Sequence, residues 1–164
     1  VRSKIDGHLM LKYVNYDIVF QEFPDEVTLA INLSLCPVCC PGCHSQFLQT
    51  DVGEALTPER LQALIDSYDG EITCVGLMGG DNDPAAVGEL FALVRRVYGD
   101  KLKTGWYSGR AQLPRDFNPR LFDYVKLGPY IEERGPLKAP TTNQRLYRFV
   151  EGQQTDITAR FHKH

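Results

Sequence analysis

Long apolar runs are missing from this sequence of 164 residues, and no stretch approaches the roughly eighteen consecutive apolar residues that indicate a membrane-spanning helix. The first residues also lack the succession of basic, apolar and small residues that is typical of a secretory signal peptide. Internal repeats and low-complexity segments are absent as well. From these absences we expect a cytoplasmic protein with no membrane partner.

The composition is that of an ordinary globular domain, with 43% hydrophobic and 24% charged residues. A chain of this length can bury one sizeable core, so we expect a single domain over residues 1–164. Its central part is expected at about 27–130, followed by a C-terminal loop and strands at 131–164. The formal net charge is only −3, and no nucleic-acid partner is expected.

Cysteines are few, but four of the five fall within eight residues, at Cys36, Cys39, Cys40 and Cys43. A secreted disulfide scaffold distributes its cysteines through the chain, whereas a tight cluster in a cytosolic protein indicates metal or redox chemistry. Three thiolates in the spacing C-x3-C-x2-C can hold an iron-sulfur cluster and leave one iron free for a small molecule. Alternatively, all four cysteines bind one zinc ion in a module without catalytic activity. The fifth, Cys74, lies in an apolar stretch and is expected to be a buried small residue.

Hydrophobic periodicity and capping residues predict alternating strands and helices. The expected strands lie at 27–35, 72–77, 102–107, 124–127 and 146–150, with one or two more within 9–20, and the expected helices at 58–68, 84–98 and 114–122. Such alternation predicts a parallel sheet with helical crossovers. Because a complete eight-fold barrel needs about 250 residues, we expect an α/β fold of the small, partial (open) βα barrel type.

Active sites of parallel α/β folds lie at the carboxyl ends of the strands. The cysteine cluster and the sequence Gly79-Gly80-Asp81 both follow predicted strands, so we expect them to meet at this edge. Two glycines allow the backbone to approach a ligand closely, and a carboxylate suits an ammonium group. Taken alone, however, a Gly-Gly-Asp-Asn segment between a strand and a helix is more often only a turn.

The cysteine spacing resembles the cluster motif of the radical S-adenosylmethionine superfamily. Over about 27–145, the sequence is more closely similar to the activating proteins of anaerobic ribonucleoside-triphosphate reductases. The resemblance is carried by four blocks, which are the cysteine segment 36–44, Met78-Gly79-Gly80-Asp81, the segment 104–109 (TGWYSG), and 123–145 with its Gly-Pro-Tyr step and Asn-Gln-Arg ending.

This resemblance implies that Cys36, Cys40 and Cys43 bind a 4Fe-4S cluster, whose open iron chelates the amino and carboxylate groups of S-adenosylmethionine. Reductive cleavage would give methionine and a 5′-deoxyadenosyl radical, which takes a hydrogen atom from a glycine of the reductase. Gly79, Gly80 and Asp81 match the family element that binds the amino end of the ligand. The implied partners are the catalytic subunit of an anaerobic (class III) ribonucleotide reductase and a flavodoxin or ferredoxin donor. An activase for another glycyl-radical enzyme is the alternative.

Several further residues are candidates whose roles stay open. His44 is a candidate ligand contact, although a histidine after a metal-site turn can equally donate to a nearby carbonyl. Ser108 is a candidate contact for the ribose or the methionine, and Lys126 and Arg145 are candidates for the ligand carboxylate. Cys39 is expected to be an unligated thiol. Gly42 stands where the wider superfamily has an aromatic residue against adenine, so the adenine contact stays unassigned.

Overall fold

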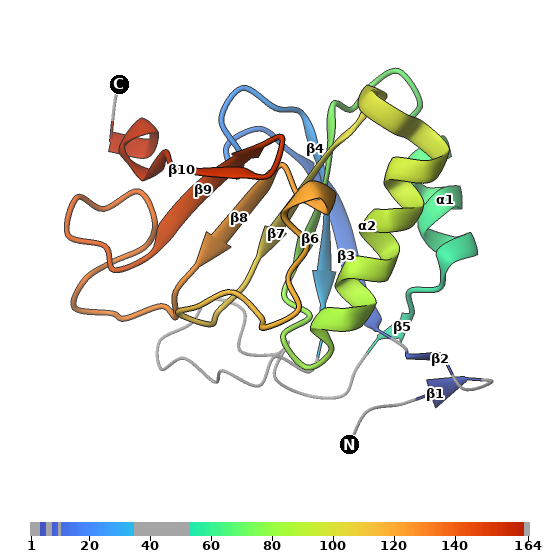
Figure 1. Ribbon diagram of the computed structural model, residues 1–164, viewed down its shortest axis with the longest axis horizontal. Coiled ribbons are helices and arrows are strands. Elements are labelled where there is room, and N and C mark those ends of the chain that lie inside the picture. The colour runs from blue at the N-terminus through green and yellow to red at the C-terminus, as the bar shows by residue number, and fades with distance from the viewer. Residues whose placement is uncertain (1–3, 6–7, 10, 35–52, 163–164) are drawn as a thin grey trace.

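The computed structural model describes residues 4–5, 8–9, 11–34 and 53–162. The cysteine cluster and His44 lie outside the described residues. The described strands are β1 (Lys4–Ile5), β2 (His8–Leu9), β3 (Lys12–Val19), β4 (Thr28–Leu33), β5 (Glu54–Ala55), β6 (Cys74–Met78), β7 (Lys103–Tyr107), β8 (Tyr124–Leu127), β9 (Arg145–Val150) and β10 (Gln153–Asp156) (Figure 1). The described helices are α1 (Pro58–Asp66) and α2 (Pro84–Tyr98), with short 3-10 turns η2 (Gly99–Lys101), η3 (Pro119–Leu121) and η4 (Thr158–His162).

Eight of the described strands form one mixed sheet in the order β10-β9-β8-β7-β6-β4-β3-β5. The central strands β4, β6, β7 and β8 are parallel, and their arrowheads point to the same edge in Figure 1. The flanking strands pair antiparallel. The predicted parallel sheet is therefore correct only for the central four strands, and the described sheet is open. Among the described residues, no α-helix joins β3 to β4 or β8 to β9, and both of these pairs are antiparallel.

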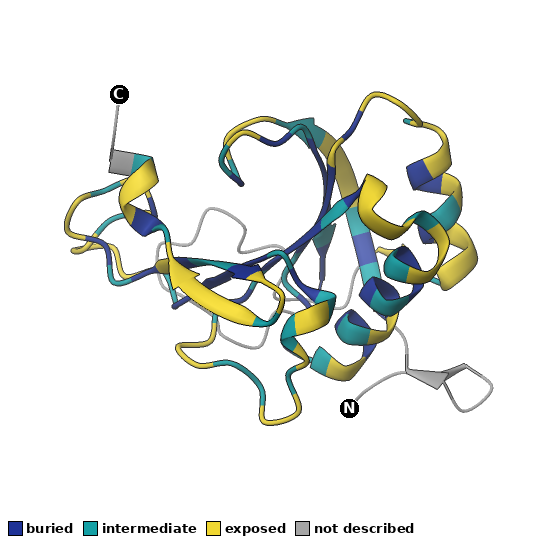
Figure 2. Cartoon of the chain, turned by 45° about the horizontal axis from the view of Figure 1, so that its top comes forward, coloured by how far each residue is buried: buried dark blue, intermediate teal, exposed yellow. Residues whose placement is uncertain are grey.

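Both α-helices pack on one face of the sheet, side by side (Figures 1 and 2). Their beginnings follow the predicted caps. The Thr57 hydroxyl accepts from the backbone N–H of Arg60 at 3.1 Å, and the Asp83 carboxylate accepts from that of Ala86 at 3.3 Å. A proline follows each cap, where its missing N–H costs nothing. These helices are the crossovers that make β4, β6 and β7 parallel.

Two of the differences from the sequence-based expectation concern the segment 114–122 and strand β10. The predicted helix at 114–122 is reduced to the 3-10 turn η3, because Pro119 forces the preceding Asn118 into an extended backbone conformation (φ −104°, ψ 104°). The connection between β7 and β8 thus carries no α-helix. Strand β10 was not predicted, because its four residues are all exposed and polar and show no apolar alternation.

The sheet face opposite the helices is packed around Phe23, which is 0% exposed. Its ring stacks on Tyr124 with centroids 5.1 Å apart and meets Tyr107 edge-on at 5.2 Å. The ring lies directly over Gly105, where an added methyl group would approach it within 2.3 Å. Cys74 is fully buried on this face, which confirms its expected role as a small core residue, and burial raises the pKa of its thiol.

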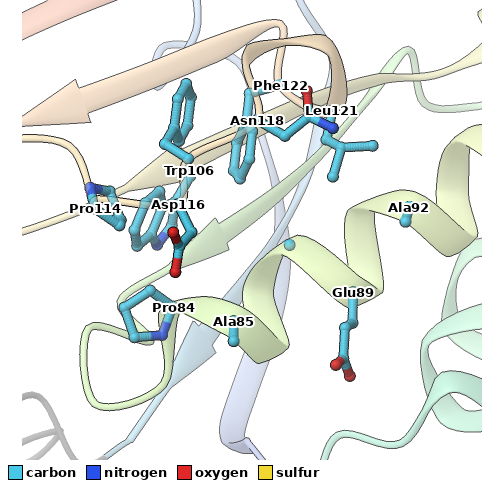
Figure 3. Close-up of a pocket in the computed structure, with 12 residues that line it drawn as sticks. Pro84, Ala85, Glu89, Ala92, Trp106, Pro114, Asp116, Asn118, Leu121 and Phe122 are labelled. Atoms are coloured by element: carbon cyan, nitrogen blue, oxygen red, sulfur yellow. The ribbon is translucent and has the colours of Figure 1, made fainter.

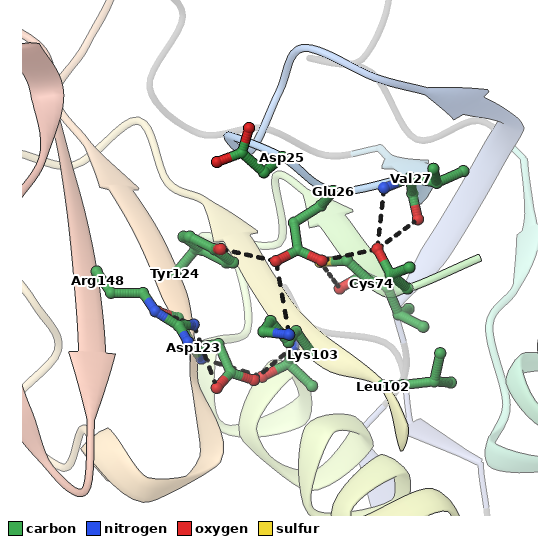
Figure 4. A network of polar contacts seen from close by, with 12 residues as sticks. Asp25, Glu26, Val27, Cys74, Leu102, Lys103, Asp123, Tyr124 and Arg148 are labelled. Carbon is green, nitrogen blue, oxygen red and sulfur yellow. Dashed lines mark hydrogen bonds and ion pairs between the residues drawn. The ribbon is translucent and has the colours of Figure 1, made fainter. Parts of the chain in front are cut away.

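A polar network braces the amino ends of the central strands (Figure 4). The buried Glu26 carboxylate accepts from Thr73 Oγ1 at 2.7 Å and from the Tyr124 hydroxyl at 2.8 Å, and Lys103 Nζ lies 3.7 Å away. Beside it, Asp123 pairs with Arg95 at 2.8 Å. Because this network lies at the edge away from the strand carboxyl ends, we interpret it as a structural brace.

Candidate functional site

The carboxyl edge of the central strands brings β4 and the Gly-Gly turn together. Asn32 and Met78 are partners in the parallel register of β4 and β6, so Leu33, the last residue of β4, lies beside Gly79, the first residue after β6. A methyl group built on Gly79 would lie 3.3 Å from the Leu33 carbonyl oxygen. Strand β4 therefore ends beside the Gly-Gly turn.

The turn depends on two glycines with positive φ, 108° at Gly79 and 89° at Gly80. Gly80 is also tightly packed, since a Cβ there would lie 2.8 Å from Val87 Cγ2 and 2.9 Å from Leu33 Cδ1. The indole N–H of Trp106 donates to the Gly79 carbonyl at 2.6 Å. These contacts fix the path of the backbone before any ligand arrives.

Asp81 and Ser108, two predicted site residues from separate segments, are in direct contact. The Ser108 hydroxyl donates to one carboxylate oxygen of Asp81 at 2.5 Å, and the Gly109 N–H donates to the other at 2.8 Å. Asp81 is only 5% exposed and Ser108 only 1%. A buried carboxylate needs such donors, and two donors leave acceptor capacity on its oxygens. The Asp81 carboxylate can therefore still bind a cation.

A cavity of about 450 Å³ opens on these residues. Its lining residues come from the turn, from the start of α2, from β7 and from the segment after β7, and they are Asp81, Pro84, Trp106, Ser108, Arg110, Ala111, Gln112 and Pro114. A second cavity of about 290 Å³, mainly apolar, adjoins it and shares Pro84, Trp106 and Pro114. Figure 3 shows the second cavity between α2 and the segment that replaces the expected third helix. The first cavity combines an apolar wall with a buried carboxylate.

The two predicted carboxylate ligands lie elsewhere. Lys126 is buried, with Nζ 3.2 Å from the Gly128 carbonyl oxygen and 5.3 Å from the centre of the Tyr107 ring. Arg145, at the start of β9, pairs with Asp156 of β10 at 3.7 Å. Neither residue lines the cavity at Asp81.

The Asn-Gln pair before Arg145 orders the connection between β8 and β9. Asn143 Nδ2 donates to the Pro129 carbonyl at 3.0 Å, and Gln144 Nε2 donates to the Gly128 carbonyl at 3.3 Å. These bonds hold both ends of the 128–144 segment together. This geometry indicates that the two side chains order the loop.

Sequence reasoning missed two residues of this site, Trp106 and Arg110. Trp106 lies within the segment 104–109, but nothing in its side-chain type indicates a bond to the turn after β6. Arg110 follows Ser108 by two residues at the same edge, and this spacing could have indicated it. The cysteine predictions and that for His44 fall outside the described residues.

Among the described residues, no three His, Cys, Asp or Glu side chains gather into a group that could hold a metal ion. The same part of the chain contains no helix with the length and apolar character needed to cross a membrane. No protein-family model, curated protein or solved structure matches this chain.

Proposed function

We propose that this chain is a radical S-adenosylmethionine activase with a partial barrel of the type found in that superfamily. It acts in the cytoplasm on the catalytic subunit of an anaerobic ribonucleoside-triphosphate reductase, with flavodoxin or ferredoxin as electron donor. Cys36, Cys40 and Cys43 hold a 4Fe-4S cluster. The turn 79–81 and Ser108 bind the ligand.

One observation carries this proposal, namely that the chain leaves β4 toward the cysteines beside Gly79. Leu33 is three residues before Cys36 and in contact distance of the turn. A thiolate cluster and a carboxylate for an ammonium group would thus lie at one sheet edge. The two halves of the proposed site come from segments that are separate in sequence, and the position of Leu33 beside the turn supports their meeting at this edge.

The described residues suit S-adenosylmethionine. The Asp81 carboxylate offers a partner for the amino group, and the apolar wall formed by Pro84, Trp106 and Pro114 offers a surface for the rest of the ligand. The cavity of about 450 Å³ is within the size range of small-molecule sites. For the cluster, the fit rests on the chemistry of the donors, since three thiolates leave one iron open to a ligand.

The chemistry that the cluster supplies when bound is one electron for cleavage of the sulfonium carbon-sulfur bond, which gives methionine and a 5′-deoxyadenosyl radical. This radical takes a hydrogen atom from a backbone glycine of the partner, so the products are 5′-deoxyadenosine and a glycyl radical. The protein must hold the ligand in a fixed orientation and exclude water during this transfer. The prearranged turn at Gly79 and Gly80 serves the first requirement.

The test is anaerobic reconstitution with iron and sulfide, followed by reduction and addition of S-adenosylmethionine. We expect a paramagnetic cluster spectrum that changes when the ligand is added, together with 5′-deoxyadenosine as a product. Zinc in place of iron, or no 5′-deoxyadenosine, would refute the proposal. Partner choice is tested by the glycyl-radical signal of the reductase subunit, with another glycyl-radical enzyme as the comparison.

Cys39 separates this proposal from a zinc-binding module. A four-thiolate zinc site needs Cys39, whereas the proposed cluster needs only the other three. We expect Cys39→Ser to retain its metal and Cys40→Ser to lose the cluster. Metal content of the two purified variants measures the difference, and loss of metal from Cys39→Ser would support the zinc-binding module.

A further inference from the structure

A third cavity, of about 170 Å³, opens beside the amino end of β8, on the edge of the sheet away from the candidate site. Three arginines line it, and each comes from a different element: Arg95 from the last turn of α2, Arg120 from η3 and Arg148 from β9. These elements are well separated in sequence. The fold therefore gathers three basic residues at one small cavity.

Two of these arginines share one acidic group. Arg95 Nη2 lies 2.8 Å from Asp123 Oδ2, and Arg148 Nη1 lies 3.5 Å from Asp123 Oδ1 (Figure 4 shows the second pair). The same carboxylate also accepts from the backbone N–H of Thr104 at 2.9 Å. Asp123 thus balances only one of the two positive charges, and both of its oxygens already have partners.

Arg120 adds a third positive charge to the cavity. Its side chain is exposed and forms no ion pair with any described residue. Its backbone carbonyl accepts from Arg95 Nε at 3.3 Å, which holds the two arginines next to each other. Glu151, exposed in the turn between β9 and β10, lines the cavity as well. Three arginines therefore meet two acidic residues, and the cavity keeps an excess of positive charge.

We propose that this cavity binds a phosphate group, either as free inorganic phosphate or as the phosphate end of a small ester. Guanidinium groups bind phosphate oxygens through paired, charge-assisted hydrogen bonds. A tetrahedral phosphate offers oxygens in several directions, which suits arginines from three elements, whereas a carboxylate offers only two oxygens. The cavity is smaller than the range of about 300–1,000 Å³ that is usual for larger ligands, so it suits a small anion. This inference does not depend on the proposed function, because the site lies at the opposite edge of the sheet.

The test is calorimetric titration of the full chain with inorganic phosphate and, separately, with ribose 5-phosphate, both at constant ionic strength. Acetate, a carboxylate, is the comparison ligand. We expect both phosphate compounds to bind and acetate not to bind. Tighter binding of the ester would identify a phosphate ester as the ligand, and tighter binding of the free ion would identify inorganic phosphate. Either order supports the site.

Arg120→Gln is the deciding variant, because its side chain pairs with no described acidic residue and its loss should leave the fold intact. We expect it to weaken phosphate binding roughly tenfold to a hundredfold, in line with the loss of a charge-assisted hydrogen bond. Arg115→Gln is the matched control, since Arg115 is exposed in the same connection between β7 and β8 but does not line the cavity. It should leave the affinity unchanged. Glu151→Gln should strengthen binding roughly twofold, because it removes a negative charge from the cavity.

Three results would overturn the assignment. The first is a wild-type chain that binds no phosphate, or binds acetate equally well. The second is an equal affinity in Arg120→Gln and Arg115→Gln, which would show that phosphate binds elsewhere on the chain. The third is weaker binding in Glu151→Gln. Circular dichroism checks that each variant is folded, and none of these results bears on cleavage of S-adenosylmethionine.

Discussion

Replacing Gly105 with alanine should test how tightly the face opposite the helices is packed. A methyl group at this position would meet three ring atoms of Phe23, at 2.3, 2.5 and 2.8 Å. The ring cannot easily move away, because it is fully buried and held between Tyr107 and Tyr124. Overpacking of a core costs about 1–3 kcal/mol, and the depth of this overlap places Gly105→Ala near the upper value.

The measurement is urea or thermal unfolding followed by circular dichroism. Each kcal/mol lost should lower the melting temperature by about 2–4 °C for a chain of this size. Gly88→Ala is the matched control, since Gly88 lies in α2 and a methyl group there meets nothing within 4 Å. That substitution should stabilise the chain by roughly 0.5–1 kcal/mol, because alanine has less backbone freedom to lose in a helix.

A double-mutant cycle separates ring overlap from other causes. Phe23→Leu removes ring atoms that the new methyl group would meet, so Gly105→Ala should cost clearly less in that background. If Gly105→Ala is as harmless as Gly88→Ala, or costs the same with leucine at position 23, the reasoning about this contact is wrong.

Three further predictions concern Gly80 in the turn, the hydrogen bond from Ser108 to Asp81, and the carboxyl group of Glu22. Gly80→Ala should destabilise the chain by about 1–3 kcal/mol and weaken ligand binding, because the φ of Gly80 is positive and a Cβ there would overlap Val87. Unfolding measures the loss of stability, and calorimetry measures the loss of binding. Ser108→Ala removes a donor from the buried Asp81 and should cost about 1–3 kcal/mol in unfolding, while Ser108→Thr, which keeps the hydroxyl, should cost less. Burial raises the pKa of the Glu22 carboxyl, so the folded chain binds this proton more tightly and loses stability as the pH rises from the ordinary carboxyl pKa to the raised one. Glu22→Gln should therefore flatten this part of the curve of unfolding free energy against pH, and an unchanged slope would contradict the assignment.

Much of the central fold could be predicted because local signals and tertiary structure agree there. Prolines and side-chain caps begin both α-helices, and alternating or continuous apolar residues mark the parallel strands. The flanking strands were harder to place. Strand β10 is wholly exposed, so its pairing with β9 depends on backbone hydrogen bonds that leave no apolar pattern in the sequence.

The candidate site shows the same limit. The rule for parallel sheets predicted that the cysteine cluster and Gly79-Gly80-Asp81 meet at one edge. The described residues place Leu33, at the end of β4, beside Gly79, while the cysteines lie outside them. The bond from Ser108 to Asp81 required the actual geometry of two loops. Lys126 was a plausible carboxylate ligand from its charge, but the alternation of β8 places it on the face where Tyr107 lies.

The bond between Trp106 and the Gly79 carbonyl has a practical consequence, because this is the only tryptophan in the sequence. All indole fluorescence therefore comes from a side chain that is hydrogen-bonded to the turn. Indole emission shifts with the polarity and hydrogen bonding around the ring nitrogen. A ligand that binds to the Gly79 carbonyl oxygen therefore alters the emission spectrum. The chain thus carries an intrinsic optical reporter of its own candidate site, with no label to attach.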